Sequence, residues 1–240
     1  MIDLHTHILP GIDDGARTLD DALEMARAFV ADGVIAVAAT PHVRVDYPTS
    51  ADVMLRAVDE LRAALEKAGI PLTLLPGAEL AVDRLARLDD DELRRLTLAG
   101  SDRYVLVETP YYGWPPEVAE QLLELRLAGF TPVLAHPERN AEVQGAPSLL
   151  APLVHGGTLV QVTAASLDGR LGAAPRQTAF HLVAAGLAHM IASDAHMPDV
   201  RAAGMQSAAD ALEDAALAEW LTSTVPRALL ERRSLPERPP

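Results

Sequence analysis

The sequence predicts a single α/β domain, a distorted barrel of seven parallel strands, and three observations lead to this prediction. Short apolar runs rich in β-branched residues recur along the chain, and each has the length of a buried strand. Amphipathic segments with the spacing of helices separate these runs. About seven such units in 240 residues are too many for two ordinary domains and nearly enough for an eight-unit barrel. An open doubly wound sheet is the alternative that the sequence leaves open.

Seven runs are expected to form the strands. They are Met1–Leu4, Val34–Ala39, Leu72–Leu75, Tyr104–Val107, Pro132–Ala135, Thr158–Val162 and Met190–Ala192. The first two helices should start after the N-caps Thr18 and Ser50 and end before Gly33 and Gly69, because these residue types favour those positions. Another helix should open near Pro115-Pro116. We expect the domain to span residues 1–233 and the proline-rich, charged tail, 234–240, to be disordered.

The composition excludes several classes of protein. With 34 acidic and 20 basic side chains, the formal net charge is −14, whereas a nucleic-acid binder needs a basic surface. The chain has no cysteine, which leaves imidazole and oxygen as its strong metal ligands. No apolar run approaches the roughly 20 residues of a membrane-spanning helix, and the acidic, polar start does not resemble a signal peptide. We therefore expect a soluble, cytoplasmic protein without membrane insertion.

Histidines and acids gather at the carboxyl ends of the predicted strands. His5 and His7 follow the first strand, His42 the second and Glu79 the third, Glu108 and His136 end the fourth and fifth, and Asp194 and His196 follow the seventh. In a parallel barrel these ends meet on the face that holds active sites. Imidazoles and carboxylates suit zinc, manganese or iron, and a glutamate can bridge two ions. Burying these acids without cations would cost several kcal/mol per charge, so the pattern predicts a multinuclear metal site.

Other histidines and acids have a simpler interpretation. His155, His181 and His189 lie on or beside predicted helices and are expected to be structural. The Asp13-Asp14-Gly15 segment follows the first strand on the same face as the predicted site. It is either part of that site or an ordinary acidic turn.

Two arginines follow predicted ligands along the chain. Arg139 comes three residues after His136, and Arg201 five residues after His196. Arginine is suited to bidentate phosphate binding and to stabilising a phosphoryl transition state, so both are candidate catalytic residues. Salt bridges to nearby carboxylates are the alternative role.

Two further segments should lie near the predicted site. The aromatic segment Tyr111-Tyr112-Gly113-Trp114 follows Glu108 and should rim the mouth, where it either stacks on a substrate ring or packs within the loop. Gln161 and Thr163 end the sixth strand, where they could orient metal ligands.

The ordered motifs together resemble one superfamily. They are the opening Met1–Gly15 with its His5-Thr6-His7 and Asp13-Asp14-Gly15 elements, Ala39-Thr40-Pro41-His42, Gly77-Ala78-Glu79, Val107-Glu108, Ala135-His136-Pro137-Glu138-Arg139 and Ser193-Asp194-Ala195-His196. This set is similar to that of the polymerase-and-histidinol-phosphatase (PHP) superfamily. More narrowly, it resembles the bacterial manganese-dependent tyrosine-protein phosphatases of capsule and exopolysaccharide loci.

The resemblance implies a distorted, TIM-barrel-like (β/α)₇ barrel of the PHP type that holds three divalent metal ions, manganese or alternatively iron or zinc. Carried over, the first ion would be held by His5, His7, Glu108 and Asp194, the second by Glu79, Glu108 and His136, and the third by Asp14, His42 and His196. Glu79 would also reach the third ion.

The expected function is metal-dependent hydrolysis of phosphotyrosine by water. The resemblance implies that the partner is a phosphotyrosine protein, an autophosphorylating bacterial tyrosine kinase that controls polysaccharide synthesis. A phenolate leaving group, with a parent pKa near ~10, needs less protonation than an alkoxide, so the lack of an obvious general acid suits this substrate. Two alternatives remain from the sequence: a small-molecule phosphatase such as histidinol phosphatase, and a metal-binding regulatory module without turnover.

Overall fold

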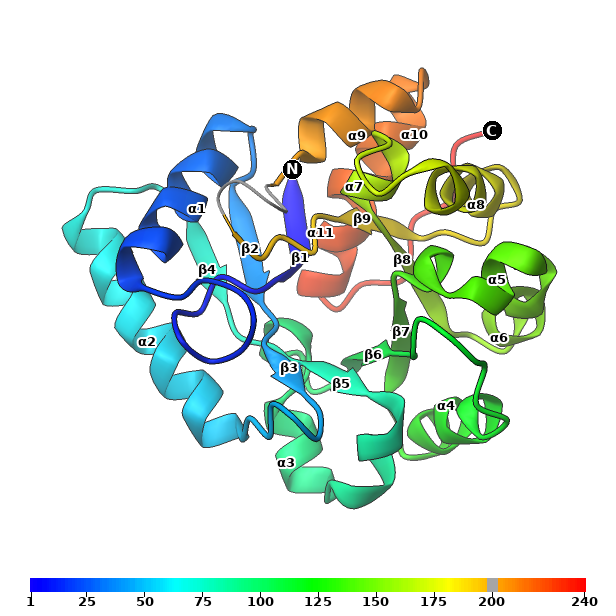
Figure 1. The fold of residues 1–240 in the computed structure, drawn as a ribbon, viewed down its shortest axis with the longest axis horizontal. Coiled ribbons are helices and arrows are strands. Elements are labelled where there is room, and N and C mark those ends of the chain that lie inside the picture. The colour runs from blue at the N-terminus through cyan, green and yellow to red at the C-terminus, as the bar shows by residue number, and fades with distance from the viewer. Residues whose placement is uncertain (198–202) are drawn as a thin grey trace.

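A computed structural model describes residues 1–197 and 203–240 of the chain (Figure 1). Its strands are β1 Ile2–Thr6, β2 Ala36–Ala39, β3 His42–Val43, β4 Thr73–Leu75, β5 Glu79–Ala81, β6 Tyr104–Glu108, β7 Thr131–Ala135, β8 Leu159–Thr163 and β9 Met190–Ala192. Its α-helices are α1 Leu19–Ala31, α2 Ala51–Lys67, α3 Asp90–Arg95, α4 Val118–Leu127, α5 Ala141–Gly145, α6 Ala151–His155, α7 Ala164–Leu167, α8 Ala173–Ala184, α9 Met205–Ala211, α10 Ala215–Glu219 and α11 Val225–Leu230.

All strand pairings between these elements are parallel. One sheet has the order β1-β2-β4 and the other the order β3-β5-β6-β7-β8-β9. Only a few residues separate β2 from β3 and β4 from β5. If each of these pairs is counted as one strand, the described strands match the seven strands that the sequence predicts. In Figure 1 the strands lie at the centre, with α1, α2, α4, α5 and α8 around them. The predicted α/β fold with parallel strands is therefore confirmed.

The first and last strands meet through a short contact. The amide of His7 donates to the carbonyl of Ala195 at 2.8 Å, and the amide of Asp194 donates to the carbonyl of His5 at 3.0 Å. An isolated parallel bridge joins Thr6 to Ala195. A continuous ladder that closes the barrel stays a prediction.

Two short strands, β3 and β5, are absent from the predicted set. β2 ends at Ala39, where the second predicted strand also ends, and Pro41 then lacks the amide hydrogen needed for pairing. Pairing resumes at His42, which lies opposite Glu79. Strands of two or three residues leave no run to recognise in a sequence. The sequence predicts that Glu79 follows the third strand, whereas in the structure Glu79 is the first residue of β5.

The predicted helix boundaries hold at the two longest helices. The Thr18 hydroxyl accepts from the amide of Asp21, whose carboxylate accepts from the amide of Thr18 in return, and Ser50 accepts from the amide of Val53. Phe29 and Leu61 are buried on the inner faces of α1 and α2. Within the described residues, none of the helices combines the length and apolar character needed to span a membrane.

The tail 234–240 contains neither helix nor strand. The Trp220 indole donates to the carbonyl of Pro236 at 3.3 Å, and the Arg238 guanidinium donates to the carbonyl of Val183 at 2.8 Å. The proposed domain limits and the disorder expected for this tail stay predictions.

Candidate metal centre

The nine predicted ligand side chains lie together where the carboxyl ends of the strands meet. Their donor atoms form four overlapping groups, within each of which all atoms lie within 4.8 Å of one another. The groups are His7, Asp14, His42 and His196; His5, Glu79 and His136; His5, His7 and Asp194; and His42, Glu79 and Glu108. The structure thus brings together residues that are almost 200 positions apart in the chain, as the strand-end argument predicts.

Glu79 lies in the middle of the cluster and is fully buried. Its Oε1 is 2.8 Å from His136 Nε2, and its Oε2 is 2.8 Å from His42 Nδ1 and 3.4 Å from His5 Nε2. Glu79 Oε2 and His42 Nδ1 lie close enough to pair but are not aligned as a hydrogen bond, and within the described part of the chain neither of these buried atoms has another hydrogen-bond partner. Buried polar atoms of this kind are costly unless they share a cation, so the donor set fits a metal site.

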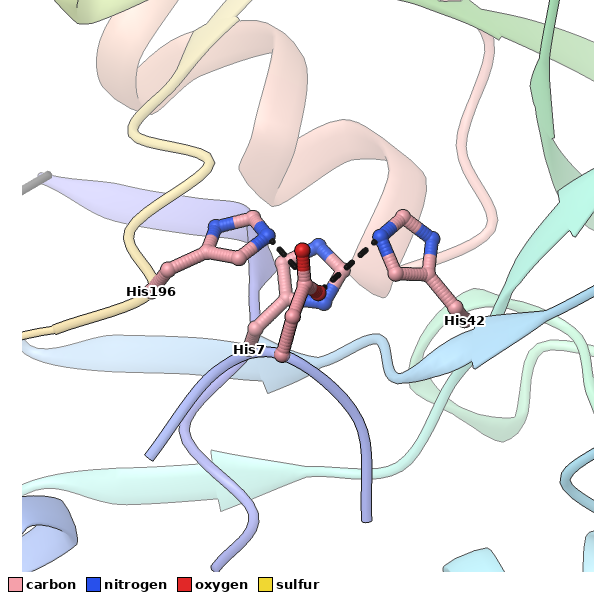
Figure 2. A group of neighbouring side chains, drawn as sticks. His7, His42 and His196 are labelled. Atoms are coloured by element: carbon pink, nitrogen blue, oxygen red, sulfur yellow. Dashed lines mark ion pairs between the residues drawn. The ribbon is translucent and has the colours of Figure 1, made fainter. Parts of the chain in front are cut away.

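Figure 2 shows the side chains of His7, His42 and His196 pointing toward one another. Asp14 Oδ1 is 3.4 Å from His42 Nε2 and 3.3 Å from His196 Nε2. The side chain of Asp14 is 39% exposed, whereas the histidine side chains are buried. Asp14 therefore lies on the side of the cluster that is open to solvent.

Clustering shifts the proton affinities of these groups in opposite directions. Burial opposes charge on His42, but the carboxylates of Glu79 and Asp14 raise its pKa to about 9. Burial and the charge of Glu79 raise the pKa of Glu108 to about 7. Burial lowers the pKa of His136 to about 4. Without metal, His42 and a fraction of Glu108 therefore hold protons near neutral pH that divalent ions would displace on binding, whereas His136 is already in the neutral form that binds a metal.

Of the two interpretations of the Asp13-Asp14-Gly15 turn, its contacts favour membership of the site, and they give Asp13 a role that the sequence did not indicate. Asp13 Oδ2 lies 2.7 Å from His7 Nδ1 and accepts from the amide of His42 at 3.0 Å, while Oδ1 accepts from the amide of Gly15 at 2.9 Å. A Cβ at Gly15 would lie 2.0 Å from the carbonyl oxygen of His7, so only glycine fits there. The turn orients His7 through Asp13 while Asp14 joins the donor cluster.

Gln161 makes the contacts expected of a residue that orients ligands. Its Oε1 lies 3.0 Å from His5 Nδ1 and accepts from the amide of His136 at 3.2 Å. The Thr163 hydroxyl makes no hydrogen bond within the described residues, and the Thr163 amide donates to the buried carboxylate of Glu138. Glu138 and Gln161 together tie the end of β8 to the segment that follows β7.

The backbone is strained at two of the donor positions. His136 has a φ of 32° and Asp194 a φ of 51°, in the left-handed region that residues other than glycine rarely adopt. Such conformations cost about 1–3 kcal/mol each and concentrate at functional sites. The positions of both side chains are therefore set against the local preference of the chain.

Arg139 lies at the edge of the cluster, where its Nη1 donates to Asp194 Oδ2. Its guanidinium also lies over the ring of Tyr111, 4.6 Å from the centroid, and the Tyr111 ring is 6.0 Å from that of His136. Tyr111 thus lines the site, while Tyr112 is 84% exposed. The other predicted catalytic arginine, Arg201, lies outside the described residues.

Arg44 is a second cation beside the cluster, and no sequence motif singled it out. Its Nη1 is 3.7 Å from Glu108 Oε2, its guanidinium forms a two-point ion pair with Asp46, and it lies over the ring of Tyr47. The Tyr47 ring in turn stacks on His42. Arg44 directly follows β3, a two-residue strand that the sequence does not predict.

The three histidines expected to be structural lie away from the donor cluster. His155 and His181 are exposed at the ends of α6 and on α8. His189 Nδ1 accepts from the amide of Val160, and burial lowers its pKa to about 4. This half-buried imidazole bonds to β8, and five other histidines lie in the donor cluster.

Together, the fold and the site define an α/β protein of parallel strands with a candidate multinuclear metal centre of imidazole and carboxylate ligands. The family described as capsular polysaccharide synthesis, CpsB/CapC, matches residues 1–227. The chain therefore belongs to the CpsB/CapC family.

Individual relatives agree with this assignment. The chain is 42% identical over 216 residues to the tyrosine-protein phosphatase YwqE of Bacillus subtilis (strain 168), covering 89% of this chain and 84% of the relative. It is 32% identical over 198 residues to the putative tyrosine-protein phosphatase CapC of Staphylococcus aureus, covering 82% and 77%. A crystal structure from work on YwqE of Bacillus subtilis and CpsB of Streptococcus pneumoniae, described as metal-dependent tyrosine phosphatases, matches with a TM-score of 0.89 and 36% identity. That match covers 100% of this chain and 98% of the other.

Proposed function

We propose that this chain is a metal-dependent tyrosine-protein phosphatase that hydrolyses phosphotyrosine with water as the nucleophile. The observation that carries the proposal is the single cluster of nine imidazole and carboxylate side chains at the carboxyl ends of the strands. The relatives named tyrosine-protein phosphatases, at up to 42% identity over most of the chain, support it.

The ligand sets implied by the resemblance are kept as part of this proposal. Three divalent ions, with manganese preferred over iron or zinc, would be held by three sets of residues. The first set is His5, His7, Glu108 and Asp194, the second is Glu79, Glu108 and His136, and the third is Asp14, His42 and His196. Distances of 3.3 Å from His7 Nε2 to Asp194 Oδ1 and of 3.9 Å from His136 Nε2 to Glu108 Oε1 support the first two sets in part. Glu108, however, groups with His42 and Glu79 and not with His5, His7 and Asp194. Ions bound there would supply a water of lowered pKa and would neutralise the phosphoryl oxygens.

The chain's own residues supply orientation and charge. Asp13 and Gln161 hold His7 and His5 by their Nδ1 atoms, so that both Nε2 atoms face the cluster. Arg139, whose side chain is 13% exposed, is placed to exchange its contact with Asp194 for one with a phosphoryl oxygen. Arg201 is proposed for the same role on sequence grounds alone.

Protonation of the leaving group sets a limit on the substrate. Burial raises the pKa of Tyr111 to about 12, so its phenol stays protonated but is a weak acid. A phenolate with a parent pKa near ~10 leaves without strong acid assistance, which favours phosphotyrosine over phosphoserine. We further propose an autophosphorylating tyrosine kinase as the protein substrate and a cytoplasmic location.

A kinetic comparison tests the proposal. The manganese-loaded protein is assayed with a phosphotyrosine peptide, the matched phosphoserine peptide and histidinol phosphate, and kcat/KM is measured for each. We expect the phosphotyrosine peptide to be preferred by at least about tenfold, and chelation to abolish turnover. A preference for histidinol phosphate would assign the site to small molecules, and no turnover of any substrate by verified metal-loaded protein would contradict an enzymatic role.

A further inference from the structure

A cavity of about 590 Å³ opens beside the metal centre. Its walls come from three segments: residues 44–46 after β3, residues 81–86 of β5 and the turn after it, and residues 108–117 between β6 and α4. The strands that carry these segments are neighbours in the sheet (Figure 1). Glu108 belongs both to the cavity wall and to the donor cluster, so the cavity lies directly beside the cluster.

The cavity is lined mainly by apolar groups. Val82, Ala86, Pro110 and Tyr111 contribute to its surface, and Val45, at its edge, is 70% exposed. Tyr111 also touches Arg139, so the cavity adjoins the arginine that is proposed to bind the phosphoryl group. A space of this size and lining suits an aromatic ring with its adjoining main chain.

The charged groups around the cavity are mostly acidic. Arg44 is the cation among the lining residues, and it is already ion-paired with Asp46 and close to Glu108. Asp83, in the turn after β5, and Glu117, before α4, are exposed on two different walls. The entrance therefore repels acidic groups and attracts basic ones.

We propose that this cavity is the subsite for the tyrosyl ring and the neighbouring residues of the substrate peptide. Its acidic walls, through Asp83 and Glu117, select peptides in which the residues beside the phosphotyrosine are basic or uncharged. The inference rests on the proposed phosphatase function and adds to it the location and charge preference of peptide binding.

The charge preference is tested with three phosphotyrosine peptides that differ only in carrying lysine, serine or glutamate on both sides of the phosphotyrosine. We expect kcat/KM to fall in that order for the unmodified protein, and added salt to narrow the range. Asp83→Lys should lower the ratio of the lysine to the glutamate peptide by about threefold to tenfold, the scale of two exposed charge interactions. Glu60→Lys makes the same charge change on the exposed face of α2 and should leave the ratio unchanged.

The ring subsite is tested by filling the cavity with Ala86→Trp, a change at an exposed position that the fold should tolerate. We expect kcat/KM for the serine peptide to fall about tenfold or more, while the inhibition constant of inorganic phosphate, which has no ring, stays at its original value. A second readout is calorimetric binding of a phosphonomethyl-phenylalanine peptide, which cannot be hydrolysed.

The outcomes separate this inference from the proposed function. Turnover of phosphotyrosine peptides with no effect of either variant would overturn the subsite and leave the phosphatase in place. No turnover of any phosphotyrosine peptide would overturn the proposed function, and binding of the phosphonate peptide would then test the subsite separately. Equal affinity of that peptide for the unmodified and Ala86→Trp proteins would overturn the subsite.

Discussion

Replacing Asp13 tests whether the turn after β1 holds the metal centre in position. The Asp13 carboxylate contacts His7 Nδ1 and accepts from the amides of His42 and Gly15, and the side chains of Asp13 and His7 are 1% and 0% exposed. Asp13→Ala removes all three contacts. Asp13→Asn keeps the shape and an oxygen that can still accept from an amide, but loses the charge.

The size of the effect follows from burial. Removing one partner of a buried, hydrogen-bonded ion pair costs about 3–5 kcal/mol, so Asp13→Ala should lower the free energy of unfolding of the metal-free protein by that amount. Loss of a carboxylate that orients a ligating histidine lowers metal affinity by about 10- to 100-fold. Asp13→Asn should fall between the alanine variant and the unmodified protein in both measurements.

Urea unfolding of chelated protein and calorimetric titration with manganese measure the two effects. Glu24→Ala, at an exposed position on α1, is the control and should match the unmodified protein. If Asp13→Ala bound manganese with unchanged affinity and unfolded at the same urea concentration, the idea that this turn positions His7 and His42 would be refuted.

Three further predictions use independent features of the molecule. Chelation should lower the melting temperature, measured by calorimetry, by about 5–10 °C per ion lost, because an ion present at 100 times its Kd adds about 2.7 kcal/mol to the free energy of unfolding. An unchanged melting temperature would mean that protons alone neutralise the buried acids. Arg139→Ala should lower kcat/KM for a phosphotyrosine peptide by about 10²-fold, and Arg139→Lys should lower it by less. Elemental analysis should show the same metal content in both variants as in the unmodified protein. A loss of metal in proportion to the loss of activity would mean that Arg139 acts by holding Asp194 in place. Burial lowers the pKa of His189 from 6.5 to about 4, so between these pH values the imidazole is protonated in the unfolded chain but not in the folded one. The free energy of unfolding should therefore fall by up to about 3 kcal/mol as the pH drops from 6.5 to 4. His189→Gln should remove that slope in urea unfolding, and an unchanged slope would assign the pH dependence to other groups.

The fold could be predicted because its main strands are strong local signals. Runs such as Tyr104–Val107 are long enough and apolar enough to identify a buried strand, and Thr18 and Ser50 are side chains that cap helices by themselves. The strands β3 and β5 could not be predicted, because two or three residues around proline and glycine carry no periodicity. They form because neighbouring strands supply hydrogen-bonding partners, which is tertiary information.

The site could be predicted as far as residue type and strand position determine it. Histidine and acid at the ends of parallel strands converge for topological reasons, which brings Glu79 and His136 together although they are 57 residues apart. The roles of Asp13 and Arg44 could not be predicted, because each depends on the path of a loop. An aspartate at position 13 or 14 reads the same in sequence, and only the turn decides which one faces His7 and which one faces the open side of the cluster.

Anomalous diffraction from crystals of the manganese-loaded protein, recorded at the manganese absorption edge, shows directly whether the nine clustered side chains hold metal ions. We expect three peaks within coordination distance of these side chains, with Glu79 and Glu108 each close to more than one peak. Peaks on another face of the molecule, or none in crystals of verified manganese content, would contradict it.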